Sequence, residues 1–159
     1  MININIPEQF YGALTNHNSS EMIKLYHDDV IFTDPAFGML QGIRAKKMWE
    51  MLLANSKSDL NIQYEILDSS NEQATVSWIA KYKFGPQRRL VENHVIASLK
   101  IKQGKIVEHH DTFNMWKWSS QALGLSGRLL GWTGFMKKKV QLKTNRALDK
   151  YMKEMTNLK

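Results

Sequence analysis

The stretch LYHDDVIFTDPAFGMLQGI, residues 25–43, decides the fold of this chain. It contains a short apolar run, Val30–Thr33, which predicts a buried strand. This strand ends at Asp34, which proline follows. Proline and glycine punctuate the next residues, a pattern typical of a hairpin, and the return arm is expected at residues 39–41.

Asp34 has two interpretations, which do not exclude each other. Alternate residues of a strand share one side, so Asp34 lies on the side of Phe32 and is expected to face the apolar interior. Loss of water there raises the pKa of a carboxyl group toward neutrality, as a general acid or base requires. An aspartate before proline also commonly bonds the backbone of its own turn.

The flanking segments predict an α+β domain. Helices are expected at residues 7–16, 21–29 and 43–55, where caps and helical spacing of apolar residues coincide. Four later segments alternate apolar and polar residues, at 60–66, 76–84, 91–101 and 107–115. Because short, turn-rich links join these segments, they are predicted to form antiparallel strands.

Composition indicates one soluble domain with an unusual charge distribution. The 159 residues include no cysteine, which excludes disulfides and thiolate metal sites. The net charge is +7, but residues 1–116 sum to −1 and residues 117–159 to +8. Neither a signal peptide at the N-terminus nor a membrane-spanning apolar run is visible in the sequence. A cytoplasmic location is therefore expected.

The basic segment 117–159 predicts helices, the longest near 135–155 with a regular apolar stripe. Trp132 and Phe135 stand close to three consecutive lysines at 137–139, a combination that suits an anionic lipid surface. We favour packing of the stripe on the rest of the fold over membrane contact, because its spacing resembles that of a core helix. No nucleic-acid partner is expected, since no motif that reads nucleic acid accompanies the charge.

The order of helix, LYHDDVIFTDPAFGMLQGI, helix, and four strands ending in GKIVEHHDTF resembles the nuclear transport factor 2-like superfamily over residues 7–116. This group includes ketosteroid isomerases, limonene epoxide hydrolases and SnoaL-like cyclases. The resemblance implies a cystatin-like or ketosteroid isomerase-like fold, in which helices close a curved antiparallel sheet into a conical pocket. Residues 1–116 would form this domain, and residues 117–159 a helical extension packed on it.

The resemblance also implies a role for Asp34, because ketosteroid isomerases carry their proton-transferring base at an equivalent Asp-Pro. Other parts of that site are missing. Phe10 stands where that family has an oxyanion-binding tyrosine, and Tyr11 is rotated from it by about 100° and is expected to point elsewhere. Ala97 stands where the family has a protonated acid. Steroid isomerisation itself is therefore not expected.

The motif EHHD supplies the second part of the expected site. On a strand, His109 and Asp111 share one face with Val107, whereas Glu108 and His110 share the other. SnoaL-like cyclases use an aspartate on this strand with a histidine as an acid/base pair, but a structural hydrogen bond between two buried groups would use the same residues. Adjacent histidines cannot converge on one ion from a strand; only His109 and Asp111 could, with Asp34 as a distant third ligand, so a metal is not expected. An organic cofactor is not expected either.

The remaining expected site residues line the inner face. Asn93 would position substrate or water, or be a satisfied core amide. The aromatic residues are either cavity walls for a flat apolar ligand or ordinary core; they are Tyr64, Trp78, Tyr82 and Phe113.

Two functions follow from this sequence. The first is a cofactor-independent isomerase, cyclase or hydrolase with Asp34, Asp111 and His109 as acid/base groups for a small apolar, even polycyclic, substrate. The second is a non-catalytic ligand-binding or dimerisation module. A solvent-reachable cavity bordered by both acids would favour the enzyme, and a cone filled by aromatic side chains would favour the module. A homodimer is expected through the outer sheet face, which carries Thr75, Ser77, Ile79 and Ile96.

Overall fold

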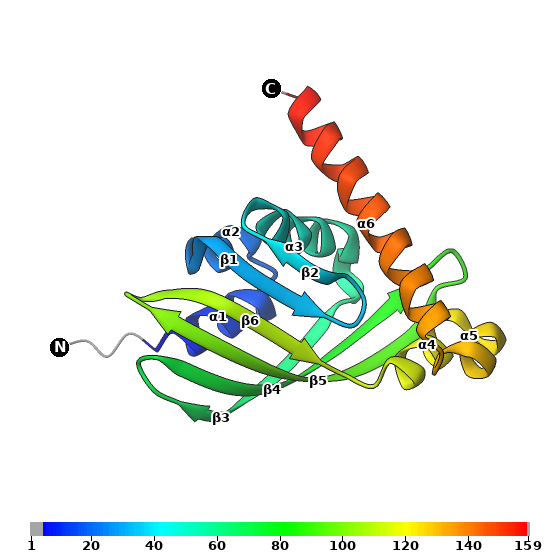
Figure 1. The fold of residues 1–159 in the computed structure, drawn as a ribbon, viewed down its shortest axis with the longest axis horizontal. Helices are drawn as coiled ribbons and strands as arrows, with labels where there is room; N and C mark the ends of the chain where they lie inside the picture. The colour runs from blue at the N-terminus through cyan, green and yellow to red at the C-terminus, as the bar shows by residue number, and fades with distance from the viewer. Residues whose placement is uncertain (1–4, 159) are drawn as a thin grey trace.

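The computed structural model describes residues 5–158 of the chain, so residues 1–4 and 159, at the outer ends of the two expected segments, lie outside the described residues. The fold is α+β, with an open, curved sheet, helices α1 to α3 on one of its faces and helices α4 and α5 at one end (Figure 1). The helices are α1 Ile6–Thr15, α2 Ser19–Lys24, α3 Ile43–Ser56, α4 Met115–Leu123, α5 Leu125–Leu130 and α6 Gly134–Asn157, with the 3-10 turn η1 at Lys57–Asp59. The strands are β1 Tyr26–Asp34, β2 Gly38–Gln41, β3 Asn61–Ser69, β4 Gln73–Phe84, β5 Arg89–Lys102 and β6 Lys105–Thr112.

The sheet has the order β2-β1-β6-β5-β4-β3 and is mixed. Strands β3 to β6 form the antiparallel meander that the alternating pattern predicts. Strand β1 pairs with β6 in parallel, so the six-stranded sheet that contains this meander is mixed rather than antiparallel. Because α3 and the whole meander separate β1 from β6, no tight turn obliges the two strands to run in opposite directions.

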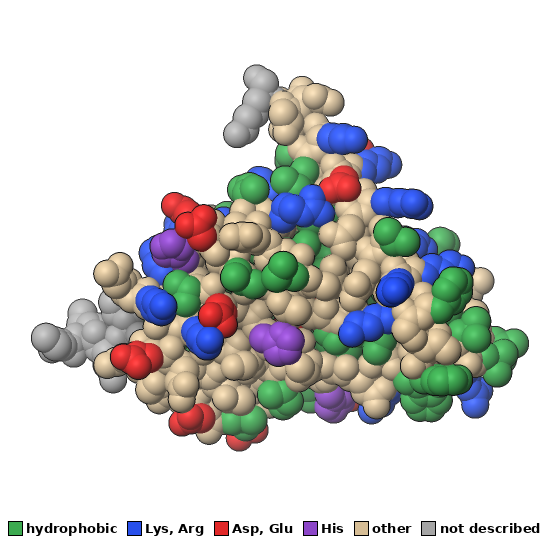
Figure 2. Space-filling model, viewed as in Figure 1, with side chains coloured by type: hydrophobic (Ala, Val, Ile, Leu, Met, Phe, Trp, Pro, Cys, Tyr) green, Lys and Arg blue, Asp and Glu red, His purple; other side chains and the backbone are tan. Residues whose placement is uncertain are grey.

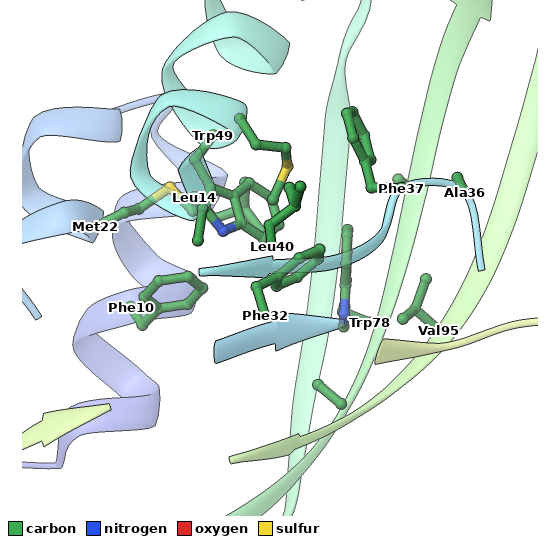
Figure 3. Packing of buried hydrophobic residues seen from close by; sticks show 14 of the residues in the cluster. Phe10, Leu14, Met22, Phe32, Ala36, Phe37, Leu40, Trp49, Trp78 and Val95 are labelled. Carbon is green, nitrogen blue, oxygen red and sulfur yellow. The ribbon is translucent and has the colours of Figure 1, made fainter. Parts of the chain in front are cut away.

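The N-terminal helices cover the concave face of the sheet and build the core there. Figure 3 shows Phe10 and Leu14 of α1 and Met22 of α2 meeting Phe32 and Leu40 of the first hairpin, and all five side chains are buried. Helix α1 begins where the side chain of Asn5 accepts the amide of Glu8, with a proline in its first turn.

The second helix is shorter than its sequence pattern indicates. It was expected to continue to residue 29, but it ends at Lys24, and Tyr26 already belongs to β1. The amide of Ile106 donates to the carbonyl of Leu25 just before this point. The buried side chain of Tyr26 is also held inside the cone. Long-range pairing therefore overrides the local helical preference of this segment.

Strand β6 carries a β-bulge that sets the phase of its side chains. Lys100 faces Glu108 while Ile101 faces Ile106, so Val107 is the extra residue. Ile106 is buried and Val107 only half-buried. The expectation that Val107 would share the inner face is therefore wrong, whereas residues 109 and 111, beyond the bulge, do point inward.

The C-terminal helices pack against the rest of the fold. Helix α4 lies along β5, and α6 lies against α3 with Met136, Val140 and Leu148 buried. Three residues of the expected apolar stripe of α6 are therefore buried, and the last turns of the helix extend past the rest of the fold (Figure 1). Within residues 5–158, no helix has both the length and the apolar character needed to cross a bilayer.

Candidate functional site

The parallel pairing of β1 and β6 brings two carboxyl groups side by side. Phe32 is in register with His109, and Thr33 with His110, so Asp34 and Asp111 are the next residues along the two strands. Both lie on the concave face, where neighbouring strands are about 4.8 Å apart. Two acids from distant parts of the sequence thus form a pair with like charge when both are ionised.

Asp34 combines the two roles that its sequence position suggests. One carboxylate oxygen accepts the amides of Ala36 at 2.9 Å and Phe37 at 2.6 Å, which is the expected turn. The side chain is half-buried. Burial raises the pKa of Asp34 to about 7; the two amides oppose this shift, and the charge of Asp111 reinforces it. At neutral pH both protonation states of Asp34 are therefore populated.

A chain of hydrogen bonds runs through the buried interior to Asp111. The indole N–H of Trp49 donates to the hydroxyl of Tyr26 at 2.8 Å, and this hydroxyl lies 2.7 Å from Nδ1 of His109. Nε2 of His109 lies 2.9 Å from the carboxylate of Asp111. The direction of these bonds depends on the tautomer of His109: with its proton on Nε2, the ring donates to Asp111 and Nδ1 accepts from the hydroxyl of Tyr26. All four side chains are buried.

Tyr11 also reaches this chain, contrary to the expectation that it would point elsewhere. Its hydroxyl lies 3.4 Å from Nε2 of His109, and both Tyr11 and Phe10 are fully buried. Helix α1 lies so deep in the concave face that two successive residues contact the interior. Burial raises the pKa of Tyr11 and of Tyr26 well above the ordinary value, so both keep their protons.

Aromatic side chains fill the deep end of the expected conical pocket. The ring centroids of Phe32, Phe10 and Trp49 lie 5.1, 5.4 and 6.0 Å from that of His109. Two shallow hollows on the described surface lie elsewhere, one at the end of α6 and one between α1 and α2. By the criterion set from the sequence, this filled interior favours the non-catalytic module.

Trp78 offers an unpaired donor on the same face as the two acids. Trp78 of β4 pairs with Val95 of β5, and Asp111 of β6 pairs with Ala97 of β5. Val95 and Ala97 are successive inward-facing residues of β5, so Trp78 is one row of side chains away from Asp111. Such rows are about 7 Å apart. The indole N–H of Trp78 has no hydrogen-bond partner among residues 5–158, although the residue is only 8% exposed. A buried donor without a partner is costly, so an acceptor that enters this region would be held there.

The other predicted lining residues are spread over the inner face. The hydroxyl of Tyr82 accepts from the indole N–H of Trp118 at 2.8 Å, and burial raises the pKa of Tyr82 to about 12, against that hydrogen bond and with help from the charge of Asp34. Asn93 and Phe113 are half-buried, Phe113 beyond the end of β6. Tyr64 is remote from the acids, because its hydroxyl donates to Glu8 of α1 at 2.9 Å.

Helix α6 holds the turn that carries Asp34, a contact that sequence reasoning missed. Side chains of Gln141, Thr144 and Asn145 donate to the three carbonyls of residues 35, 36 and 37, at 3.1, 2.8 and 2.9 Å. In the sequence, these three polar residues have the spacing i, i+3 and i+4 and therefore lie on one side of the helix, next to its apolar stripe. This spacing could have predicted a polar contact between α6 and the rest of the fold. Tyr26, Trp49 and Trp118 were also missed, because only the tertiary fold brings them to the site.

No group of three or more histidine, cysteine, aspartate or glutamate side chains gathers within the described part of the chain in a way that could hold a metal ion. The carboxyl groups of Asp34 and Asp111 can transfer protons, and the indole N–H of Trp78 can donate a hydrogen bond.

Comparisons with known proteins identify a family for this chain and several structures with a similar fold. Residues 8–109 match the SnoaL-like domain family. An LEH-like epoxide hydrolase of M. tuberculosis is similar in structure, with a TM-score of 0.57 and 19% identity over 79% of this chain and 93% of the other. A hypothetical protein with a ketosteroid isomerase-like fold from Catenulispora acidiphila, solved with trimethylamine, has a TM-score of 0.59 and 16% identity over 82% and 98%.

An epoxide hydrolase/cyclase-like enzyme of pyran ring formation in the polyether salinomycin has a TM-score of 0.60 and 11% identity over 69% of this chain and 88% of its own. At such low identity these structures show the shared fold alone. No curated protein matches the sequence.

Proposed function

Because this chain belongs to the SnoaL-like domain family, we propose that it is an enzyme that moves protons on a small apolar molecule. The observation that carries this proposal is the pair formed by Asp34 and Asp111 on the inner face, the face that also carries the unpaired N–H of Trp78. Similar structures named as epoxide hydrolase and cyclase-like enzymes support this general class.

In the proposed reaction, Asp34 is the group that takes and returns the proton. With a pKa of about 7, it is a base in one half of the molecules and an acid in the other at neutral pH. Asp34 in its ionised form would remove a proton from the substrate or from an attacking water. The proton would then go back to a different atom of the substrate, as isomerisation, cyclisation or hydration requires.

His109 would act as a positioning residue rather than as a second acid. Both of its ring nitrogens are engaged, Nδ1 by Tyr26 and Nε2 by Asp111, and the ring is 1% exposed. Its Nε2 lies 2.9 Å from the carboxylate of Asp111 and so fixes the position of this carboxyl group beside Asp34. Burial raises the pKa of Asp34, and the charge of Asp111 adds to this shift. The indole N–H of Trp78 would donate to a substrate oxygen that gains negative charge.

Access to the acids depends on the C-terminal helices. Trp118 of α4 bonds Tyr82, and α6 bonds the Asp34 turn through Thr144 and Asn145. Entry of a substrate into the filled interior would require some of these contacts to open. The shape of the aromatic residues nearby suits a flat, apolar substrate.

The test begins with a thermal-shift screen of polycyclic ketones and epoxides, followed by turnover assays on the compounds that bind. We expect Asp34→Asn to lower kcat by about 100-fold or more, because general acid/base catalysis contributes at least this much. Asp111→Asn should also lower kcat. The matched control is Asp29→Asn, on the exposed side of the same strand. If Asp34→Asn and Asp111→Asn each left turnover unchanged, the acid/base role would be disproved.

The second candidate function is a non-catalytic module, which the filled cone favours. In that case the chain of hydrogen bonds at His109 serves stability alone. A screened compound that binds in the cone, protects the amide of Ala36 from hydrogen exchange and is returned unchanged after prolonged incubation would support the module over the enzyme.

A further inference from the structure

Helices α5 and α6 meet at a corner that exposes large apolar side chains. This α5–α6 corner consists of Leu125, Leu129, Leu130, Trp132 and Phe135. Trp132 is 75% exposed, Leu125 72% and Phe135 69%. Figure 2 shows hydrophobic side chains gathered at this end of the molecule, with lysine and arginine side chains nearby along α6. A contiguous apolar patch of this kind on a water-facing surface marks an interaction site.

The local structure turns the large side chains outward. Glycines occupy the inner side of α5: a side chain at Gly127 would begin 1.8 Å from the carbonyl oxygen of Ser119 on α4. Because this side is in backbone contact with α4, the leucines four residues apart, Leu125 and Leu129, face away from the fold. The indole N–H of Trp132 is bonded to the carbonyl of Leu129 at 3.1 Å, so only its apolar ring projects.

Positively charged side chains border the corner, and no acidic side chain is paired with them among the described residues. Lys137, Lys138 and Lys139 follow within the first turns of α6, and Arg128 lies on α5; all four are exposed. None of them forms an ion pair with the residues that the structure describes. The first turn of α6 contains no acid, although a helix N-terminus favours acids over cations. Helix stability therefore does not account for this lysine run.

We propose that the α5–α6 corner docks this protein on the surface of an anionic phospholipid bilayer. Trp132, Phe135 and the leucines would enter the headgroup region, and Lys137 to Lys139 would contact the negative headgroups. The charge asymmetry of the chain, +8 in residues 117–159 against −1 in the rest, orients the same end toward an anionic surface. The stripe of α6 that packs on α3 is a different face of the helix, so packing and docking are compatible.

The experiment uses the full chain with vesicles of equal parts phosphatidylcholine and phosphatidylglycerol, and with vesicles of phosphatidylcholine alone. We expect co-sedimentation with the anionic vesicles only, and weaker binding as salt rises. Trp132→Ser with Phe135→Ser should lower the partition constant by roughly tenfold or more, since both apolar anchors are lost. Replacing Lys137, Lys138 and Lys139 by glutamine should lower it similarly and flatten the salt dependence.

Matched controls separate the corner from general properties of the surface. Leu67→Ser with Leu90→Ser removes two exposed apolar residues of the sheet. Replacing Lys143, Lys150 and Lys153 by glutamine removes the same charge further along α6. Both controls should bind like the unchanged protein. Equal binding to both vesicle types, no binding to either, or binding lost equally in the controls would overturn the proposal. A further outcome would also overturn it: the unchanged protein does not bind vesicles, and the Trp132/Phe135 variant has half the particle mass of the unchanged protein. That result would assign the corner to contact with a second copy of the chain.

Discussion

At the scale of single residues, the turn of Asp34 and the surroundings of its carboxyl group shift the pKa of this group in opposite directions. Two backbone amides favour the ionised form, while burial and the neighbouring charge of Asp111 favour the neutral form. Burial prevails, and the pKa rises to about 7 from an ordinary value of 3.8. A group that binds its proton more tightly in the folded state than in the unfolded state makes stability fall as pH rises between those two values.

This sign gives a prediction for Asp34→Asn. Between pH 5 and pH 7 the unchanged protein should lose stability relative to the variant, by up to ~1.4 kcal/mol per pH unit, and above pH 7 the difference should level off. Urea unfolding of both proteins at pH 5, 6, 7 and 8 measures it. Asp29→Asn, as control, should show no such trend. A difference between Asp34→Asn and the unchanged protein that stays constant with pH would contradict the assigned pKa.

At the scale of elements, α6 depends on a narrow buried stripe rather than on its composition. Most of its residues are exposed, many of them charged, and Met136, Val140 and Leu148 are its buried residues. Hydrogen bonds to the Asp34 turn, and an ion pair between Arg44 and Asp149 at 2.6 Å, fix the orientation of α6 on the fold. The exposed ion pair contributes little by itself.

Two leucines of this helix form a matched pair for a stability test. Leu148 is fully buried and Leu142 is 59% exposed. Leu148→Ala should lower the free energy of unfolding by about 2–5 kcal/mol, because it leaves a cavity. Leu142→Ala should change it by less than about 0.5 kcal/mol. Guanidinium unfolding measures both, and equal effects of the two substitutions would show that α6 does not pack as described.

At the scale of the whole molecule, the outer face of the sheet is the surface without helices. Thr75, Ser77 and Ile79 are half-buried there, and Ile96 is 45% exposed. Helices α1, α2 and α3 all lie on the other face (Figure 1). An open sheet with apolar residues on an uncovered face is a suitable surface for a second copy.

The homodimer therefore stays a prediction, with light scattering as its measurement. The unchanged protein should have twice the chain mass of 18.5 kDa at micromolar concentration. Ile96→Lys should shift it to the monomer, because a charge would be buried at the centre of the contact. Leu142→Lys, at an exposed position of α6 away from the sheet, is the control and should remain dimeric. A monomer in the unchanged protein would refute the prediction.

The sequence by itself determined the features that repeat locally. The period of two at residues 60–66, 76–84, 91–101 and 107–115 predicts the meander, since alternate residues must lie on opposite faces of a strand. The same alternation placed Asp34, His109 and Asp111 on the inner side. Family resemblance then predicted the curved sheet with its covering helices, and the family match and the similar structures confirm that fold.

Only the tertiary structure decided which residues of this site meet. The parallel contact of β1 with β6, the hydrogen bonds of Tyr26 and Trp49 to the histidine chain, and the approach of Tyr11 all join segments far apart in the sequence. The bulge at Val107 likewise depends on the partner strand. A periodic pattern reports which side of an element is apolar, but not which other element will cover that side. That choice is made by packing over the whole molecule, and here it filled the cone with aromatic rings.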